Sequence, residues 1–391
     1  MKTLQKLSVL FLSIVIFISC KQKNMLVAQI EGLGNDTILV EYAPISQMHN
    51  IDDFLTDTII AKDNKFEYTP SITEPIMAYF FPKNAAFKRL NGHPFHPQQK
   101  HLVLKLKPDD KLSVKGRLHD YYLEYYTNGS DFNKDFCEVR SKHIKNSSNA
   151  VQIELLIDSL KNSNEDKAII NELFEKRRAF DKLAGKEELK YIKSNFDKEL
   201  SAYYLCRQNL DTLMKYHANL NDKIANGSFK NTLDGQVLRF KKYTLIQDAE
   251  KNITKGKTAP NFVLKSIKGD DFELNSVKNK YVVLDFWGSW CGWCIKGFPK
   301  MKEYYSKYQS KVEFIGIDCN ETEEKWKTSV ADNGLKWTQV INAESIEKDA
   351  SVMYAIKGYP TKIILDKDKR IVDVYKGETE DFYNKLDELL K

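Results

Sequence analysis

Two cysteines three positions apart, Cys291 and Cys294, have a type and spacing that suggest chemistry. They follow an almost continuous apolar run, residues 281–287, which is typical of a strand buried on both faces, and a helix is expected over residues 293–308. Cysteines at this spacing at a helix start can close a disulfide within one turn. The first thiol would face the unpaired N–H groups and the positive end of the helix dipole, which stabilise a thiolate. We therefore predict that Cys291 attacks a partner's disulfide and that Cys294 then displaces the partner.

A zinc site and a purely structural disulfide account for this cysteine pair less well. A zinc site needs two further ligands, but residues 256–391 contain no histidine and one other cysteine, Cys319. A structural disulfide across so short a loop would remove little entropy from the unfolded chain. No metal site and no cofactor is predicted.

A carboxylate precedes the pair. Asp285 lies six residues before Cys291, between Leu284 and Phe286 of the expected strand. In that environment the carboxyl would be desolvated and its pKa raised, so it could take a proton from Cys294. A carboxylate that faces solvent at the strand end is the alternative.

A proline follows later in the chain, in Gly358-Tyr359-Pro360-Thr361, just before a β-branched run. The Tyr359–Pro360 bond is a candidate cis peptide, and the loop edge there could pair with an extended peptide. An ordinary proline at a strand entry is the alternative.

The chain changes character twice. Residues 25–129 contain short alternating runs broken by turn residues, which predict antiparallel strands in a sandwich-like β domain. Residues 130–251 carry apolar side chains at helical spacing and predict an α-helical segment. Residues 256–391 alternate strands with helices, including one helix expected over residues 345–354, and predict an α/β layer fold.

Composition excludes several classes of protein. A length of 391 residues corresponds to two or three domains, and 42% hydrophobic with 29% charged residues is ordinary for a globular protein. The net charge of +6 is too small over this length to indicate nucleic-acid binding. Six cysteines are too few for a disulfide scaffold.

The amino terminus reads as an export signal. An apolar run over residues 7–18 follows Lys2 and Lys6 and ends at Ser19-Cys20, and it is shorter than the roughly 20 residues of a membrane-spanning helix. The small residue before a cysteine resembles the lipobox of bacterial lipoproteins. We expect residues 1–20 to be a lipoprotein signal peptide with lipidation of Cys20, so that the chain is anchored to a membrane of the cell envelope and faces the periplasm. An ordinary cleaved signal with a chance cysteine is the alternative.

The segment 284–294, which contains Trp290-Cys291-Gly292-Trp293-Cys294, resembles the thioredoxin fold when taken with Pro299 and residues 358–361. Together with Thr258-Ala259-Pro260 ahead of it, it is similar to the TlpA-like and redoxin branch, which comprises extracytoplasmic thiol-disulfide oxidoreductases. The resemblance implies that Cys291 attacks, Cys294 resolves, Asp285 is the buried carboxylate and Pro360 is the cis-proline. The residues that flank them would contact the substrate, namely Trp290, Gly292, Trp293 and Tyr359.

The first two regions resemble the amino-terminal part of Bacteroidetes lipoproteins of this kind, through Gly32 and residues 36–38, 108–114 and 128–130. Two positions depart from the family pattern. Trp293 stands where a proline usually precedes the second cysteine, and Gly297 stands where some members have a glutamate. Without that glutamate, Asp285 is expected to act alone.

The leading hypothesis is a thiol-disulfide oxidoreductase that acts on disulfide- or thiol-bearing envelope proteins and receives electrons from an upstream thiol donor. A thiol peroxidase of the redoxin type is one alternative, although Gly288 stands where a hydroxyl donor would hold the peroxide and Ser289 lies only close by. A partner-binding lipoprotein with an auxiliary redox domain is the other.

Overall fold

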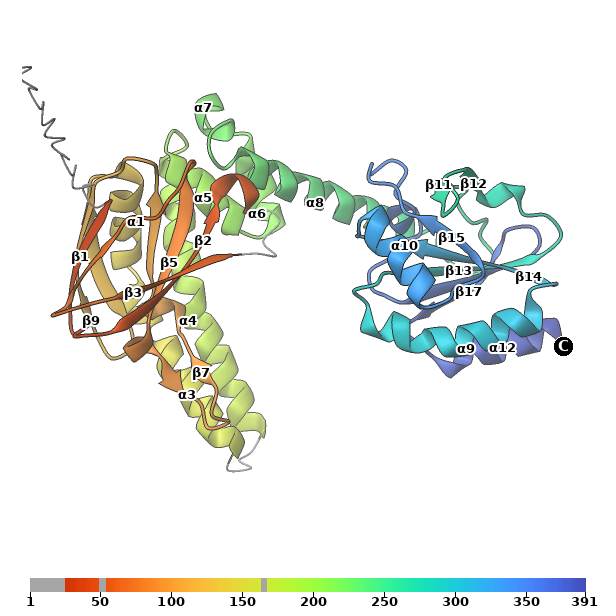
Figure 1. Cartoon of the computed structure of the whole chain (residues 1–391), viewed down its shortest axis with the longest axis horizontal. Coiled ribbons are helices and arrows are strands. Elements are labelled where there is room, and N and C mark those ends of the chain that lie inside the picture. Colours follow the sequence, from red (N-terminus) through yellow and green to blue (C-terminus); the bar gives the residue numbers. More distant parts are fainter. Residues whose placement is uncertain (1–24, 49–53, 163–166) are drawn as a thin grey trace, which may run out of the picture. The chain divides into compact units, whose positions relative to one another are not determined.

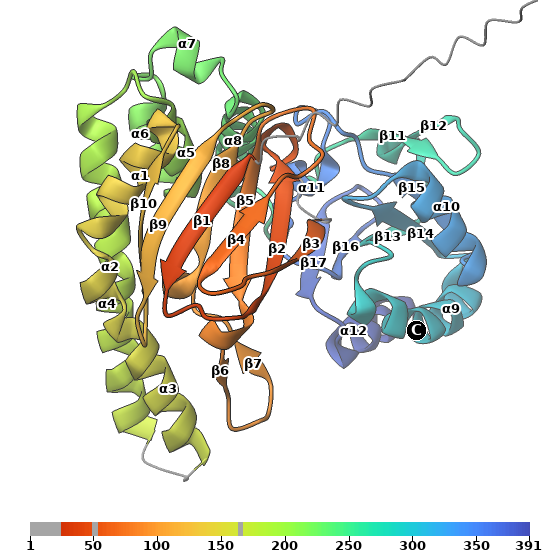
Figure 2. The ribbon, with the colours of Figure 1, turned by 60° about the vertical axis from the view of Figure 1, so that its left-hand side comes forward.

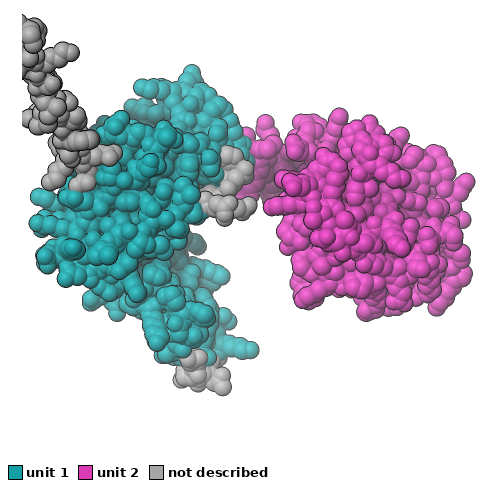
Figure 3. All heavy atoms as spheres, viewed as in Figure 1, with its two compact units in different colours: residues 1–236 teal, residues 237–391 magenta. Residues whose placement is uncertain are grey.

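A computed structural model of the chain describes residues 25–48, 54–162 and 167–391. The chain divides into two compact units, residues 1–236 and residues 237–391 (Figure 3). The predicted signal peptide and Cys20 lie outside the described residues. Within the described part, no helix combines the length and the apolar character needed to cross a bilayer.

The described β region of the first unit forms two four-stranded sheets, β10-β9-β1-β4 and β3-β2-β5-β8, and a short β6–β7 hairpin. Side chains alternate along each strand, so Leu26 and Ile30 from one sheet and Val40 and Phe80 from the other fill a common core between the sheets. The strands are β1 (Leu26–Glu31), β2 (Thr37–Pro44), β3 (Leu55–Ile60), β4 (Lys65–Tyr68), β5 (Ile76–Pro82), β6 (Phe87–Lys88), β7 (Pro94–Phe95), β8 (Leu102–Leu106), β9 (Leu112–Leu118) and β10 (Leu123–Asn128).

One pairing differs from the antiparallel arrangement that the sequence predicts. Strands β1 and β9 run parallel, with Leu26 opposite Leu112. A parallel pair needs a long crossover connection. The chain between β1 and β9 supplies it, because it passes through the strands of the second sheet.

Helices follow the strands, and those within residues 131–207 lie along one side of the sandwich (Figure 2). Their bounds are α1 (Asp131–Ser141), α2 (Ile144–Ser147), α3 (Asn149–Asn162), α4 (Lys167–Ser194), α5 (Glu199–Arg207), α6 (Leu210–His217), α7 (Asp222–Ala225) and α8 (Lys230–Glu250). Helix α8 runs from the first unit into the second. The predicted order, a β-rich region followed by helices and then a mixed α/β region, is confirmed.

The second unit is built on one seven-stranded sheet with the order β12-β11-β15-β14-β13-β16-β17, in which β13, β14 and β15 are parallel. The strands are β11 (Val263–Ser266), β12 (Asp271–Glu273), β13 (Tyr281–Trp287), β14 (Val312–Asp318), β15 (Thr338–Ile341), β16 (Thr361–Leu365) and β17 (Ile371–Lys376). The helices are α9 (Gly292–Tyr308), α10 (Glu323–Asp332), α11 (Ala350–Met353) and α12 (Glu380–Leu390).

The helix expected over residues 345–354 is wrong in extent, because only α11 forms. Asp349 is its N-cap, and the carboxylate accepts a hydrogen bond from the N–H of Val352 at 3.2 Å. Asn342 donates to the same carboxylate at 2.6 Å. A capping aspartate fixed in this way starts the helix late.

Alternation along β13 divides its side chains between two cores. Val283 and Trp287 pack with α9, α10 and α12, whereas Leu284 and Phe286 pack with α11 and the segment around β11. Asp285 has the same parity as Val283 and Trp287, so it faces the layer of α9 and α12. These two helices lie side by side along one face of the sheet (Figure 1).

The packing of α9 gives a first prediction. Met301 is 1% exposed in the core beneath α9, so Met301→Ala should lower the free energy of unfolding by about 2–5 kcal/mol. The five tryptophans all lie between residues 287 and 337, so tryptophan fluorescence during urea unfolding reports the second unit alone. The neighbouring Lys302→Ala, at an exposed position, is the control and should change the midpoint little. Equal effects of the two substitutions would contradict this description of the core.

Candidate active site

Cys291 and Cys294 form a disulfide at the N-terminus of α9, with their Cα atoms 5.3 Å apart. Cys291 is the N-cap of the helix, and its sulfur accepts a hydrogen bond from the N–H of Cys294 at 3.2 Å. After reduction, the same donors and the helix dipole would stabilise a thiolate on Cys291. Cys291 is 7% exposed and Cys294 is 2% exposed, so the residue at the cap is the more exposed of the two.

Aromatic side chains surround the cap. Trp290 is 53% exposed and Trp293 is 67% exposed, which is unusual for side chains of this size. The Trp290 indole donates to the carbonyl of Cys319 at 3.0 Å and meets the ring of Tyr359 edge-on, 5.1 Å between centroids. Tyr359 thereby links the cap to the loop that carries Pro360, where the Tyr359–Pro360 peptide bond is cis.

Asp285 is buried, at 3% exposure, and does not face solvent. It lies directly opposite Lys362 in the antiparallel pairing of β13 with β16, and the Lys362 ammonium is 3.5 Å from its Oδ1. The same ammonium donates to the Glu378 carboxylate at 2.6 Å. Burial raises the pKa of Asp285, the charge of Glu378 raises it further, and Lys362 opposes both effects.

A second carboxylate, which the sequence did not indicate, lies near Asp285. Glu378 reaches Lys362 from the connection between β17 and α12. Its carboxylate lies against Gly297 of α9, in the space where a side chain at that position would begin. Spacing in sequence gives no hint of this contact, because about 80 residues separate the two positions.

A second carboxylate pair, which the sequence pattern did not indicate, holds the loop before Cys291. The Glu321 carboxylate accepts hydrogen bonds from the N–H of Ser289, at 2.6 Å, and from its hydroxyl. Asp318, at the end of β14, has no exposed surface, and burial together with Glu321 raises its pKa to about 9. The Ser289 hydroxyl is thus engaged with Glu321. The signal that could have found this pair is the cluster Asp318-Cys319-Asn320-Glu321 directly after a buried strand.

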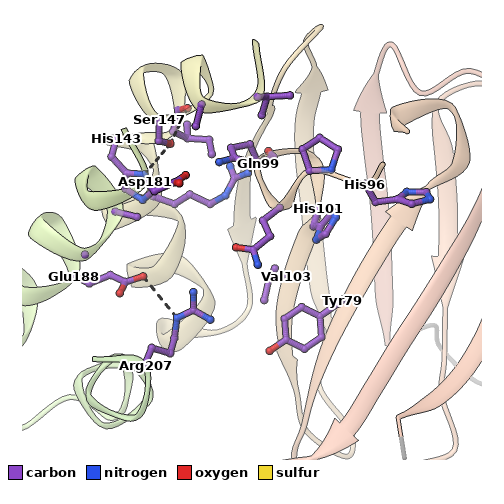
Figure 4. A pocket seen from close by; sticks show the side chains of 18 of the residues that line it. Tyr79, His96, Gln99, His101, Val103, His143, Ser147, Asp181, Glu188 and Arg207 are labelled. Carbon is purple, nitrogen blue, oxygen red and sulfur yellow. Dashed lines mark hydrogen bonds and ion pairs between the residues drawn. The ribbon is translucent and has the colours of Figure 1, made fainter. Parts of the chain in front are cut away.

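A cavity of about 960 Å³ lies in the first unit, between the sheet that contains β5 and β8 and the helices beside it. Tyr79 enters it from β5 and His101 from the turn directly before β8, and Glu188 and Arg207 enter it from the helices α4 and α5 (Figure 4). Its lining residues all belong to the first unit, so it is not part of the cysteine site.

Comparisons with known proteins match the second unit to thioredoxin-like and thiol-disulfide oxidoreductase sequences. A family model described as thioredoxin-like matches residues 279–371. A thiol-disulfide oxidoreductase ResA from Bacillus cereus is 37% identical over 155 residues, which cover 38% of this chain and 86% of that protein. The ResA of Bacillus subtilis is 30% identical over 136 residues, which cover 34% of this chain and 74% of that protein. The chain belongs to the ResA family of thiol-disulfide oxidoreductases.

A solved structure is also similar, that of the thioredoxin domain of a thiol-disulfide oxidoreductase from Bacteroides vulgatus. It is 29% identical, with a TM-score of 0.34, and the match covers 35% of this chain and 99% of that domain. The predicted likeness to thioredoxin-fold redox proteins and the predicted enzyme class are both confirmed.

The buried Asp318 of this ResA-family enzyme predicts a pH dependence of stability. Between about pH 4 and pH 9 the folded state holds a proton on Asp318 that the unfolded state has lost, so stability falls as the pH rises. Asp318→Asn, whose amide can still donate to Glu321, should reduce the fall in urea midpoint between about pH 5 and pH 8. The second unit contains no histidine, so tryptophan fluorescence in this window is free of histidine titration.

The pKa of Asp285 is also raised, so the urea midpoint of Asp318→Asn should still fall somewhat as the pH rises. A variant whose midpoint falls with pH as steeply as that of the wild type would show that Asp318 is ionised in the folded state.

Proposed function

We propose that Cys291 and Cys294 are the redox-active pair and that the enzyme exchanges electrons with disulfides of proteins in the cell envelope. The observation that carries this proposal is the disulfide at the N-terminus of α9, with its more accessible sulfur at the capping position. A sulfur in that place is stabilised as a thiolate by backbone donors, and the thiolate is the form that attacks disulfides.

The reaction begins with the pair reduced. The Cys291 thiolate attacks one sulfur of the partner's disulfide, a mixed disulfide forms, and the partner's other sulfur leaves as a thiolate. Cys294 then loses its proton to Asp285 and attacks the Cys291 sulfur, which releases the partner's second thiolate. The partner gains two electrons and the enzyme is left with its disulfide. An upstream thiol donor reduces this disulfide and closes the cycle.

The exposed aromatic surface supports a protein as the partner. Trp290, Gly292 and Trp293 are exposed around the cap, and Tyr359 and Pro360 form the adjoining loop. Large exposed aromatic side chains are typical of binding surfaces, where they contribute much of the binding energy. We assign Trp290, Gly292, Trp293 and Tyr359 to contact with the partner's chain on either side of its disulfide, with the buried cis-proline Pro360 beside them.

Location completes the proposal. The apolar run before Cys20 supports export and lipid attachment at that cysteine, with the redox unit facing the periplasm. Proteins in that compartment carry disulfides that need reduction or exchange.

Trapping tests the cysteine assignment. In Cys294→Ser the mixed disulfide on Cys291 cannot be resolved, so partners should accumulate as covalent adducts that non-reducing electrophoresis separates and mass spectrometry maps to Cys291. Cys291→Ser is the matched control and should trap nothing. Adducts that persist in Cys291→Ser would show that the order of attack is wrong.

Fractionation tests the anchor. Cys20→Ala should move the protein from the membrane fraction to the soluble envelope fraction, because the acyl chains would have no attachment site. Metabolic labelling with a fatty acid provides the direct readout. Labelled, membrane-bound Cys20→Ala protein would contradict the assignment.

A further inference from the structure

A buried group of charges lies beneath α9, on the side of the sheet that faces the cysteines. Lys362 is 2% exposed and Asp285 is 3% exposed, and they face each other across β13 and β16. Glu378 accepts from Lys362 at 2.6 Å through one carboxylate oxygen and from the hydroxyl of Tyr383 at 2.5 Å through the other. Oδ1 of Asp285 has the ammonium 3.5 Å away and no hydrogen bond among the described residues.

Gly297 brings this group to the helix that carries the resolving cysteine. Gly297 lies three residues after Cys294, on the same face of α9. A Cβ at this position would overlap the Glu378 carboxylate. Glycine therefore leaves room for a carboxylate one helical turn from Cys294, and Glu378 fills that room.

The charges in the group do not balance when every member is ionised. Two carboxylates share one ammonium, so the buried group would carry a net negative charge. Like charges at close range oppose full ionisation, and one carboxyl holds a proton more strongly than usual. Asp285 has the longer contact with the ammonium, at 3.5 Å, whereas Glu378 accepts hydrogen bonds of 2.6 Å and 2.5 Å on its two oxygens.

We propose that Glu378 is a positioning residue: acting through Lys362, it sets the pH above which Asp285 is ionised and can accept the Cys294 proton, and so the pH at which Cys294 becomes the resolving nucleophile. The proposal rests on the proposed function of Cys291 and Cys294. In the step concerned, the Cys294 proton moves to Asp285, a bond forms between the two enzyme sulfurs, and the bond from Cys291 to the partner's sulfur breaks. The partner's sulfur leaves with the electron pair.

Other elements contribute few charges around Asp285. On β14 the residue opposite Asp285 is Gly316, which has no side chain. On α9, the Lys300 ammonium lies over the Tyr383 ring and pairs with the exposed Glu380, and the Lys296 ammonium lies over the Trp293 ring. Tyr383 is on α12. Glu378 is therefore the described carboxylate that shares a buried cation with Asp285.

The test follows the resolving step with dithiobis(nitrobenzoate). Reduced full-length protein should release two thionitrobenzoate anions in sequence, the first when Cys291 attacks the reagent and the second when Cys294 attacks Cys291. The thionitrobenzoate anion leaves without taking up a proton. The dependence of the second-phase rate on pH therefore reports the transfer of the Cys294 proton. Protein with serine at both 291 and 294 gives the background from the other cysteines, which are Cys20, Cys137, Cys206 and Cys319.

Glu378→Gln keeps the shape of the side chain but removes its charge, so Lys362 would pair with Asp285 alone. The pKa of Asp285 should fall, and the profile of the second phase should move down by about one pH unit or more. The plateau rate should also fall, because a less basic carboxylate removes the proton less well. The first phase should keep its rate.

Two further variants make the result specific. Glu380→Gln also removes one negative charge, two residues further along the chain and from an exposed ion pair. It should leave the pH profile of the second phase unchanged. Gly297→Ala keeps every charge but displaces the Glu378 carboxylate, so its profile should move in the same direction as that of Glu378→Gln. If Glu378→Gln does not fold, Gly297→Ala decides the question, because alanine favours a helix.

The possible outcomes distinguish a failure of the proposed cysteine roles from a failure of the role proposed for Glu378. Wild-type protein that shows no second phase would overturn the proposed roles of the cysteines. A normal wild-type second phase with superimposed profiles for wild type, Glu378→Gln and Gly297→Ala would overturn the role of Glu378 alone. A lower urea midpoint without a shift in the profile would show that Glu378 only stabilises the fold, which also overturns the proposal.

Discussion

The attachment of α9 to strand β13 determines where the two sulfurs lie. Trp287 at the end of the strand has no exposed surface, and its ring meets Phe298 of α9 edge-on, 5.1 Å between centroids. This contact fixes the helix over the sheet, and the short loop from the strand then delivers Cys291 to the cap. Helix N-termini need an acceptor for their free N–H groups, and here a sulfur supplies it. The position of the disulfide is thus a consequence of how the core packs.

The loop between strand and helix is held from the neighbouring strand. Glu321 binds both the N–H and the hydroxyl of Ser289, and the Cys319 carbonyl accepts from the indole of Trp290. Both contacts come from the segment that follows β14. The cap is therefore supported on one side by its own helix and on the other by this segment. Packing and hydrogen bonds of this kind keep the geometry of the cap well defined.

Local pattern was enough to predict the cysteine pair, the strand and helix that carry it, and a desolvated Asp285, because each depends on residues close in sequence. The partners of Asp285 depend on register and on a connection far along the chain. Lys362 did leave a signal, since a lysine inside the apolar run Thr361–Leu365 must be buried if the strand is central. Glu378 left none, because only the packing of α12 on α9 brings it to Gly297. The parallel pairing of β1 with β9 was also not predicted, because the two strands are far apart in sequence and local pattern does not show which strands pair.

The buried charges beneath α9 are poorly explained by stability alone. Moving ions from water into a protein interior costs free energy, and their mutual attraction often does no more than offset that cost. Well-packed apolar side chains stabilise the fold as much or more. The flanking positions of the same strands, Val283 and Ile364, are apolar and belong to the core. An apolar pair in place of Asp285 and Lys362 would extend that core without loss. An Asp–Lys–Glu group whose charges do not cancel adds a proton-binding site on the side of the sheet that α9 covers, which an apolar pair lacks.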